Sequence, residues 1–148
     1  MLSCTFFGHR DCPESIKPAL FSAIEHLIIS NGVRTFYVGN QGNFDRLTAS
    51  VLRDIKALHP DVEYCVVLAY LPQKAYSDNT EITVYPEGIE IVPRRFAIDF
   101  RNRWMVEKSD YVITCVNRSF GGAAKSKNYA EKHGKHMIEI SPIAVNTI

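Results

Sequence analysis

Residues 35–45 read TFYVGNQGNFD, an apolar strand-forming run that ends in a glycine-bearing turn. The same order recurs at residues 111–125, YVITCVNRSFGGAAK, where a second apolar run leads into paired glycines. Glycine lets backbone N–H groups approach an anion closely, and the positive end of a following helix favours negative charge there. Two such turns predict a phosphate-bearing ligand held between them. They indicate a ligand class and no particular reaction.

The rest of the chain alternates strand and helix around these turns. The expected strands cover residues 2–7, 34–38, 62–71, 110–116 and 136–140. Apolar residues at helical spacing predict a first helix from Ile16 to Leu27 and a second from Leu47 to Leu58. A third helix contains Phe96, Phe100 and Trp104 and ends near Ser109, and a fourth covers about 122–133. This alternation predicts an α/β fold, a Rossmann-like three-layer sandwich with a mostly parallel five-stranded sheet.

One domain accounts for the whole of residues 1–148, because 46% hydrophobic content in 148 residues supplies one full core. Residues 72–93 contain three prolines and interrupt the alternation after the third strand. We expect a small irregular insertion there, with at most short strands around 82–85 and 88–92. Its apolar residues are candidates for a lid or for a homo-oligomer interface: Ile82, Val84, Tyr85, Ile89 and Ile91.

Charge and cysteine content exclude several classes of protein. A formal net charge of +1 argues against general affinity for nucleic acid or for an anionic membrane. No stretch has the ~18 apolar residues that a membrane span needs, and the N-terminus lacks the features of a signal peptide, so we expect a cytoplasmic protein. The chain has no Cys-x-x-Cys pair and no convincing metal-ligand spacing, and we predict neither a metal nor a cofactor.

The four cysteines are expected in different surroundings. Cys4, Cys65 and Cys115 fall inside predicted strands, where cysteine usually acts as a small buried apolar residue. Cys12 alone falls in a loop, beside the turn of residues 8–11, and is the candidate for a reactive thiol.

Polar and glycine residues gather after three of the predicted strands. Parallel sheets bind ligands outside the carboxyl ends of their strands, where the chain switches direction. The predicted ligand-binding residues are Gly8, His9, Arg10, Gly39, Asn40, Gly42, Asn43, Asp45, Arg103, Gly121, Gly122 and Ala123. A guanidinium such as that of Arg10 suits a bidentate grip on phosphate.

Structural alternatives accompany these assignments. The glycines either line a phosphate or shape tight turns, and Asp45 either caps the second helix or bonds a ribose hydroxyl. The arginines of the third helix form a solvated face, or one of them turns toward the glycines. Arg101 and Arg103 lie about 200° apart on a helix, so only one of them can do so.

These motifs resemble the SLOG superfamily, which includes DprA and the "lonely guy" phosphoribohydrolases. Residues 39–47 look like its Gly-x-x-x-Gly-x-Asp element, with the glycine spacing one residue shorter. The segments at 6–10, 101–113 and 121–125 are similar to an uncharacterised bacterial or phage branch. The resemblance covers nearly all of the chain outside 72–93, implies a nucleotide-binding Rossmann-like domain, and favours Arg103 as the phosphate-binding arginine.

One departure from the phosphoribohydrolases concerns catalysis. Their second glycine turn continues to a catalytic glutamate, whereas Lys127 or Asn128 falls near that position here and Glu131 comes one turn later. The resemblance therefore implies a retained phosphate cradle and a lost catalytic carboxylate. We expect a sensor or carrier of a nucleotide or an ADP-ribose-like ligand.

Two other functions stay open. The first alternative is an N-glycosidase or phosphoribohydrolase that acts on nucleoside monophosphates, which requires a carboxylate at the scissile bond. The candidates are Asp45, Asp99, Glu81, Glu87 and Glu90. The second is binding of single-stranded DNA by analogy with DprA, against which the neutral net charge argues.

Overall fold

A computed structural model describes residues 2–70 and 81–141. The strands are β1 (Ser3–Gly8), β2 (Thr35–Val38), β3 (Glu63–Val67), β4 (Ile82–Val84), β5 (Tyr111–Cys115) and β6 (His136–Glu139). The α-helices are α1 (Lys17–Asn31), α2 (Asn43–Leu58), α3 (Ala97–Lys108) and α4 (Gly122–Lys132), and short 3₁₀ turns cover η1 (Glu14–Ile16), η2 (Ile89–Ile91) and η3 (Arg94–Phe96). The predicted alternation of strand and helix is confirmed.

The six strands form one parallel sheet in the order β4-β3-β2-β1-β5-β6. The chain adds strands outward from β1 on one side, then crosses back and continues with β5 and β6 on the other. Strand β1 therefore lies beside β5, with Cys4 opposite Tyr111 and Gly8 opposite Cys115. This reversal between β1 and β5 is the point at which doubly wound sheets bind ligands.

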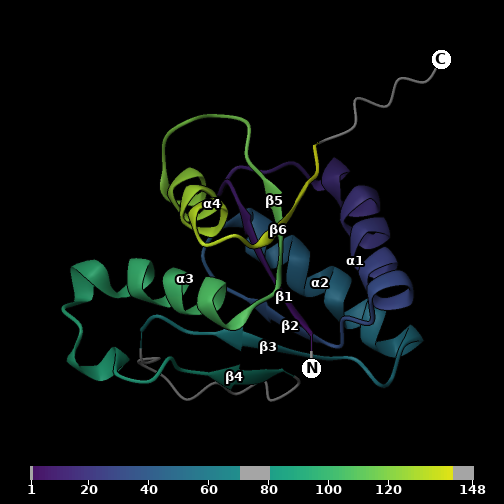
Figure 1. The fold of residues 1–148 in the computed structure, drawn as a ribbon, viewed down its shortest axis with the longest axis horizontal. Helices are drawn as coiled ribbons and strands as arrows, with labels where there is room; N and C mark the ends of the chain where they lie inside the picture. Colours follow the sequence, from purple (N-terminus) through teal and green to yellow (C-terminus); the bar gives the residue numbers. More distant parts are fainter. Residues whose placement is uncertain (1, 71–80, 142–148) are drawn as a thin grey trace.

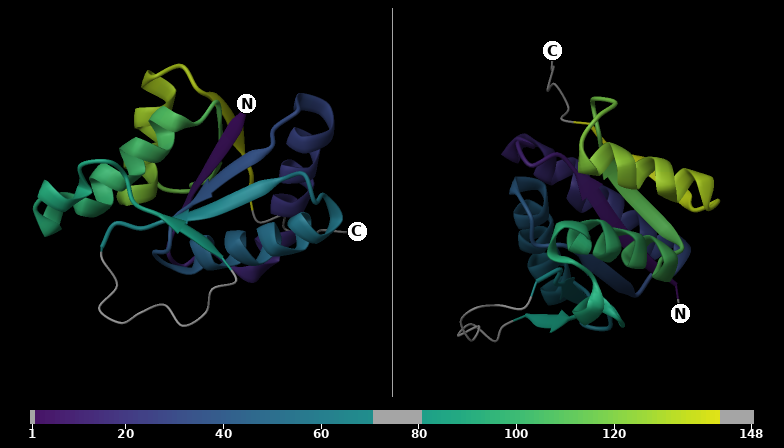
Figure 2. Two further views of the ribbon diagram at one scale, coloured as in Figure 1. Left: turned by 90° about the horizontal axis from the view of Figure 1, so that it is seen from below. Right: turned by 90° about the vertical axis from the view of Figure 1, so that its left-hand side faces the viewer.

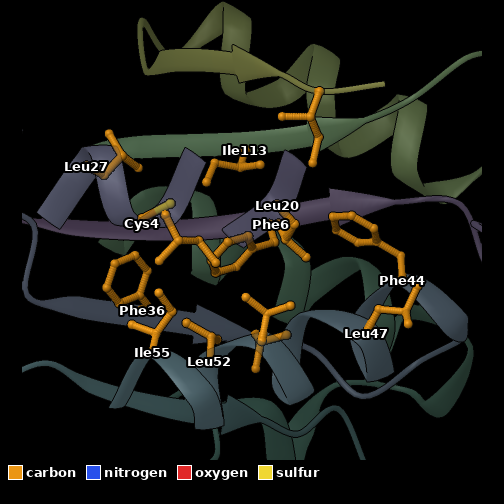
Figure 3. Close-up of a cluster of buried hydrophobic side chains, with 14 of the residues drawn as sticks. Cys4, Phe6, Leu20, Leu27, Phe36, Phe44, Leu47, Leu52, Ile55 and Ile113 are labelled. Carbon is orange, nitrogen blue, oxygen red and sulfur yellow. The ribbon is translucent and has the colours of Figure 1, made fainter. Parts of the chain in front are cut away.

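Helices cover both faces of the sheet (Figure 1). Helices α1 and α2 pack together on one face, and α3 and α4 pack together on the other, with the sheet between the two pairs (Figure 2). The first face holds the main core, in which Leu20, Phe36 and Ile55 are at most 1% exposed (Figure 3). A smaller apolar cluster under α3 and α4 includes Met105 and Ala130. This arrangement is the predicted three-layer sandwich.

The insertion agrees with its prediction at one end and differs from it at the other. Residues 82–84 form β4, the short strand expected around 82–85, and β4 joins the sheet at its edge, which therefore has six strands instead of five. Residues 89–91 are a 3₁₀ turn where a strand was expected, since Gly88 has a positive φ of 85° that redirects the chain. The part of the insertion at 72–80 lies outside the described residues.

Helix α3 buries a different face from the one that its aromatic residues indicate. Phe96 is 48% exposed, whereas Ala97, Arg101 and Met105 are at most 3% exposed. Trp104 contacts the sheet through an edge-to-face packing with Tyr37 of β2, with ring centroids 5.6 Å apart. The large aromatic residues thus lie at the side of the buried face. The buried face itself consists of the residues that follow each of them by one position.

None of the helices in the described parts of the chain has the length and apolarity that crossing a bilayer requires.

Candidate functional site

A cavity of about 370 Å³ opens at the carboxyl edge of the sheet, at the reversal between β1 and β5. Its walls come from the end of β1, the start of α2, the inner face of α3 and the turn before α4. The lining residues are Phe6, Phe7, Gly8, His9, Arg10, Gln41, Asp45, Ile98, Arg101, Asn102, Met105, Arg118, Gly121, Gly122 and Ala123. Among these described residues are three arginines and a single carboxylate, so the cavity has an excess of positive charge.

The turn before α4 presents unused backbone donors to this cavity. Gly121 has φ 96° and precedes the first turn of α4, whose first intrahelical bond runs from the Lys125 N–H to the Gly121 carbonyl. Within the described residues, no protein acceptor bonds the amides of Gly122 and Ala123. Both residues line the cavity, where the start of a helix favours an anion.

The turn before α2 is different, because the protein itself occupies its donors. The Gln41 N–H donates to Asp45 Oδ2 at 2.8 Å, and the Asn43 N–H donates to the Arg10 carbonyl at 2.9 Å. Asp45 thus reaches back to close the turn from within the helix. The two glycine turns are therefore unequal: the second is open to an anion, and the first is filled by a carboxylate of the chain.

The other predicted residues of the first turn lie beside the cavity or behind it. Gly39, Asn40 and Gly42 line a neighbouring hollow, which shares Asp45 with the cavity. Gly42 has φ 94°, and a Cβ there would lie 2.9 Å from the Arg10 Cα, so glycine is required for close packing. The Asn43 side chain donates to the Cys12 carbonyl, on the far side of the turn.

Gly8 has a packing role at the cavity floor. A Cβ at this position would lie 2.3 Å from Cγ of Phe44, the first large buried residue of α2. The absence of a side chain lets the α2 ring sit directly against the end of β1. Gly8 therefore lines the cavity because two elements meet there closely.

Arg101 lines the cavity, and Arg103 does not. Arg101 is 2% exposed; its Nη1 donates to the Val67 carbonyl at 2.9 Å and to Asn40 Oδ1 at 3.3 Å. Arg103 is exposed and lines a separate surface hollow between α3 and α4. The resemblance favours Arg103 as the phosphate-binding arginine, whereas in the structure Arg101 is the arginine that lines the cavity.

Asp45 combines access to the cavity with a desolvated position. The residue is half-buried, yet the protein surrounds its carboxyl group closely enough that burial raises its pKa to about 6. The Gln41 N–H and the positive charges of Arg101 and Arg10 act in the opposite direction, toward the ionised form. Burial outweighs them, so Asp45 exchanges its proton close to neutral pH.

His9 joins the two loops at the cavity mouth. It is 7% exposed, and its Nε2 accepts a hydrogen bond from the Asn117 N–H at 3.2 Å, which places the proton of the neutral ring on Nδ1. Burial, reinforced by the charge of Arg118, lowers the His9 pKa below its usual value. His9 is therefore a neutral positioning residue for the loop that leads to Gly121.

Arg118 lies in the same loop and lines the cavity. Its guanidinium bonds Asp11 through both terminal nitrogens, at 3.0 and 3.4 Å, and lies 5.6 Å from the Phe120 ring centroid. Asp11 and Phe120 are exposed, so these contacts hold the arginine at the rim. A phosphate at the start of α4 would meet a guanidinium that is already oriented.

Of the carboxylates proposed for catalysis, Asp45 alone among the described lining residues faces the cavity. Asp99 pairs with Lys125 at 2.6 Å on the outer surface. Glu81 pairs with Arg53 at 2.7 Å near the β4 edge, and Glu87 accepts a bond from the Trp104 indole. Glu90 is exposed on η2.

Sequence reasoning left several lining residues out of the site: Gln41, Ile98, Arg101, Asn102, Met105 and Arg118. Arg118 had a usable signal, because it lies inside the second turn. The α3 residues had a weaker signal. Helical spacing places four of them on one face of the helix, but their apolar, polar and charged types do not indicate a ligand: Ile98, Arg101, Asn102 and Met105. Their placement depends on which face of α3 meets the sheet.

Comparison with known proteins adds no family. No family model matches the chain, and a search of curated proteins finds no significant match. The likeness to the SLOG superfamily therefore stays a prediction from short motifs.

Proposed function

We propose that this protein binds a nucleotide or nucleotide-derived small molecule through a phosphate group, as a sensor or carrier. The observation that carries the proposal is the turn before α4, where the amides of Gly122 and Ala123, which have no acceptor among the described residues, meet a cavity that is also lined by three arginines. Backbone donors at a helix start and arginine side chains are the groups that proteins use for phosphate.

The remaining walls suit the rest of such a ligand. Ile98 offers apolar surface for a sugar or base, and the Asp45 carboxylate accepts hydrogen bonds from hydroxyl groups. A volume of about 370 Å³ lies in the range of small-molecule sites. The proposal therefore includes mononucleotides and ADP-ribose-like molecules.

Thermal unfolding tests this function directly. We expect AMP, ADP, NAD or ADP-ribose at millimolar concentration to raise the unfolding midpoint, since a ligand at ~100 times its Kd adds about 2.7 kcal/mol to the free energy of unfolding. A panel in which none of these compounds moves the midpoint would contradict the proposal.

Two substitutions at Gly122 separate binding from folding. An added Cβ there meets no heavy atom within 4 Å, so both Gly122→Ala and Gly122→Asp leave the fold intact. We expect Gly122→Asp to abolish binding, because its carboxylate repels the phosphate, while Gly122→Ala retains it. Equal binding by the two variants would contradict the placement of the phosphate at this turn.

A second candidate function rests on Asp45. Cleavage of an N-glycosidic bond passes through an oxocarbenium-like state that a nearby carboxylate stabilises, and Asp45 is such a group in the cavity wall. Its bond to the Gln41 N–H ties it to the first turn, however, and this favours a binding role.

Chromatography of reaction mixtures distinguishes the two functions. We expect no release of free base from nucleoside monophosphates or NAD above background. An enzyme would lower the barrier by at least ~8 kcal/mol and give steady release. Base that appears with the wild type and disappears with Asp45→Asn would replace the binding proposal by the hydrolase.

A further inference from the structure

Two free cysteines from distant parts of the chain meet beneath the cavity wall. Cys115 ends β5, opposite Gly8 of β1. The turn that follows β1 folds back, with the Cys12 N–H bonded to the His9 carbonyl at 3.1 Å, and brings the Cys12 Sγ to 3.7 Å from the Cys115 Sγ. A disulfide needs about 2.05 Å between these atoms, so a small approach joins them.

A small hollow gives this pair a route to solvent. Its volume is about 80 Å³, and both cysteines line it together with His9, Asp11, Pro13, Asn117 and Arg118. Each cysteine is itself no more than 7% exposed. A molecule of the size of hydrogen peroxide fits such a space, whereas a bulky disulfide such as oxidised glutathione does not.

The same hollow shares two residues with the ligand cavity, His9 and Arg118. The His9 ring is bonded to the Asn117 N–H, and Arg118 is bonded to Asp11. Each of these contacts joins the loop that carries Cys12 to the loop that follows Cys115. Any movement of one sulfur toward the other is therefore transmitted to residues of the cavity wall.

We propose that Cys12 and Cys115 are a peroxide-responsive modification site, whose reversible disulfide shifts the cavity-wall residues of both loops. One thiol loses its proton and the thiolate attacks a peroxide oxygen, so that the S–O bond of a sulfenic acid forms, the O–O bond breaks, and the departing hydroxide takes up the proton as water. The second thiolate then attacks the sulfenyl sulfur, the S–S bond forms, and the oxygen leaves as a second water. The two thiols lose two electrons and two protons in total, and the peroxide takes them up.

Burial sets the rate of this reaction. It raises the pKa of Cys12 above its usual value and that of Cys115 to about 12, so both thiols are protonated at neutral pH. Because the thiolate is the nucleophile, disulfide formation accelerates as the pH rises from 7 toward 9. Cys4 is fully buried, and its pKa is raised further, which leaves it outside the reaction.

Intact mass and peptide mapping of the wild-type protein test the bond. After hydrogen peroxide treatment at pH 8.5, we expect a loss of two hydrogen masses and one peptide pair linked through residues 12 and 115, both reversed by dithiothreitol. Cys12→Ser and Cys115→Ser should each abolish the link, and Cys65→Ser should retain it. Failure to form the link, or oxidation to sulfinic acid instead, would overturn the proposal.

Backbone amide NMR tests the shift of the wall. Oxidation should move the signals of His9, Arg10, Asn117 and Arg118, and leave those of Gly32 and Gly134 in place. Changes confined to the two cysteines would show a disulfide that leaves the cavity wall unmoved, contrary to the proposal. Neither measurement requires a ligand, so its outcome is separate from that of the proposed function.

Discussion

Asp45 and Arg101 show how single residues decide the character of the cavity. A Cβ on Gly39 would lie 2.7 Å from the Asp45 carboxylate and 3.1 Å from the Arg101 guanidinium, so both groups crowd the same glycine. The arginine is buried with bonds to Val67 and Asn40, and its positive charge partly offsets the burial of the acid. The pair supplies a fixed cation and an acid that titrates close to neutral pH.

The raised pKa of Asp45 predicts a pH-dependent cost to stability. The folded protein keeps this proton up to about pH 6, while the unfolded chain loses it near 3.8. The folded state therefore binds more protons in this window, and the contribution of Asp45 to the free energy of unfolding falls as the pH rises through it. Asp45→Asn should be more stable than the wild type by about 1–3 kcal/mol at pH 7.

Denaturant unfolding at pH 4 and pH 7 measures this difference. The gain of Asp45→Asn over the wild type should be smaller at pH 4 than at pH 7. Asp54→Asn, at an exposed position of the same helix, is the matched control and should show little change. A gain that is equal at both pH values would contradict the argument.

At the residue scale, the sequence predicted the cavity in part. His9, Arg10 and the paired glycines could be found because they follow apolar runs. The opposite orientation of Arg101 and Arg103 could also be found from helical geometry. Which of the two is buried could not, because the Val67 carbonyl and the Asn40 amide that bond Arg101 are brought to it only by the tertiary fold.

At the scale of elements, the two strand–turn–helix units look alike in sequence and differ in structure. Helix α2 begins against the end of β1, with Phe44 packed on Gly8 and its turn closed by Asp45. Helix α4 begins away from the core: Gly121 and Gly122 are exposed, and an added Cβ on either meets no heavy atom within 4 Å. Packing thus assigns the first unit to the core and leaves the start of the second exposed.

The contact between β1 and α2 predicts a large effect of a small substitution. Gly8→Ala places a methyl group 2.3 Å from the Phe44 ring, which is 1% exposed and belongs to the main core. Overpacking of this kind costs about 1–3 kcal/mol. Urea unfolding should show this loss for Gly8→Ala and almost none for Gly122→Ala. Wild-type stability of Gly8→Ala would mean that α2 can shift freely against β1.

Element boundaries were predictable to within a few residues wherever apolar periodicity was strong, as in α1 and β5. The short strand β4 was harder, since three residues at a sheet edge carry little pattern, and its pairing with β3 extends the sheet. The hydrogen bond by which Asp45 closes the first glycine turn was not predictable. An aspartate in the first turn of a helix can equally cap the helix, bind a ligand or accept a bond from the preceding turn.

At the scale of the whole molecule, the parallel sheet explains why the candidate residues converge. Strands β2 and β5, which precede the two glycine turns, end at the same edge of the parallel sheet. The cavity lies at this edge, where the chain reverses between β1 and β5, and α3 forms one of its walls. The three-layer architecture and this edge were predictable, because strand–helix alternation permits few topologies. The inner face of α3 was not, since it depends on packing across the sheet.

The central position of β1 has a consequence for the order of events during synthesis. Cys4 of β1 lies opposite Tyr111 of β5, so β1 leaves the ribosome 107 residues before this neighbour. Such distant pairings are slow to form. The backbone amides at 122–123, which line the cavity, emerge later still, and the cavity is incomplete on a nascent chain that lacks them. A complete cavity would thus report that the chain from β1 through the start of α4 has been made and folded.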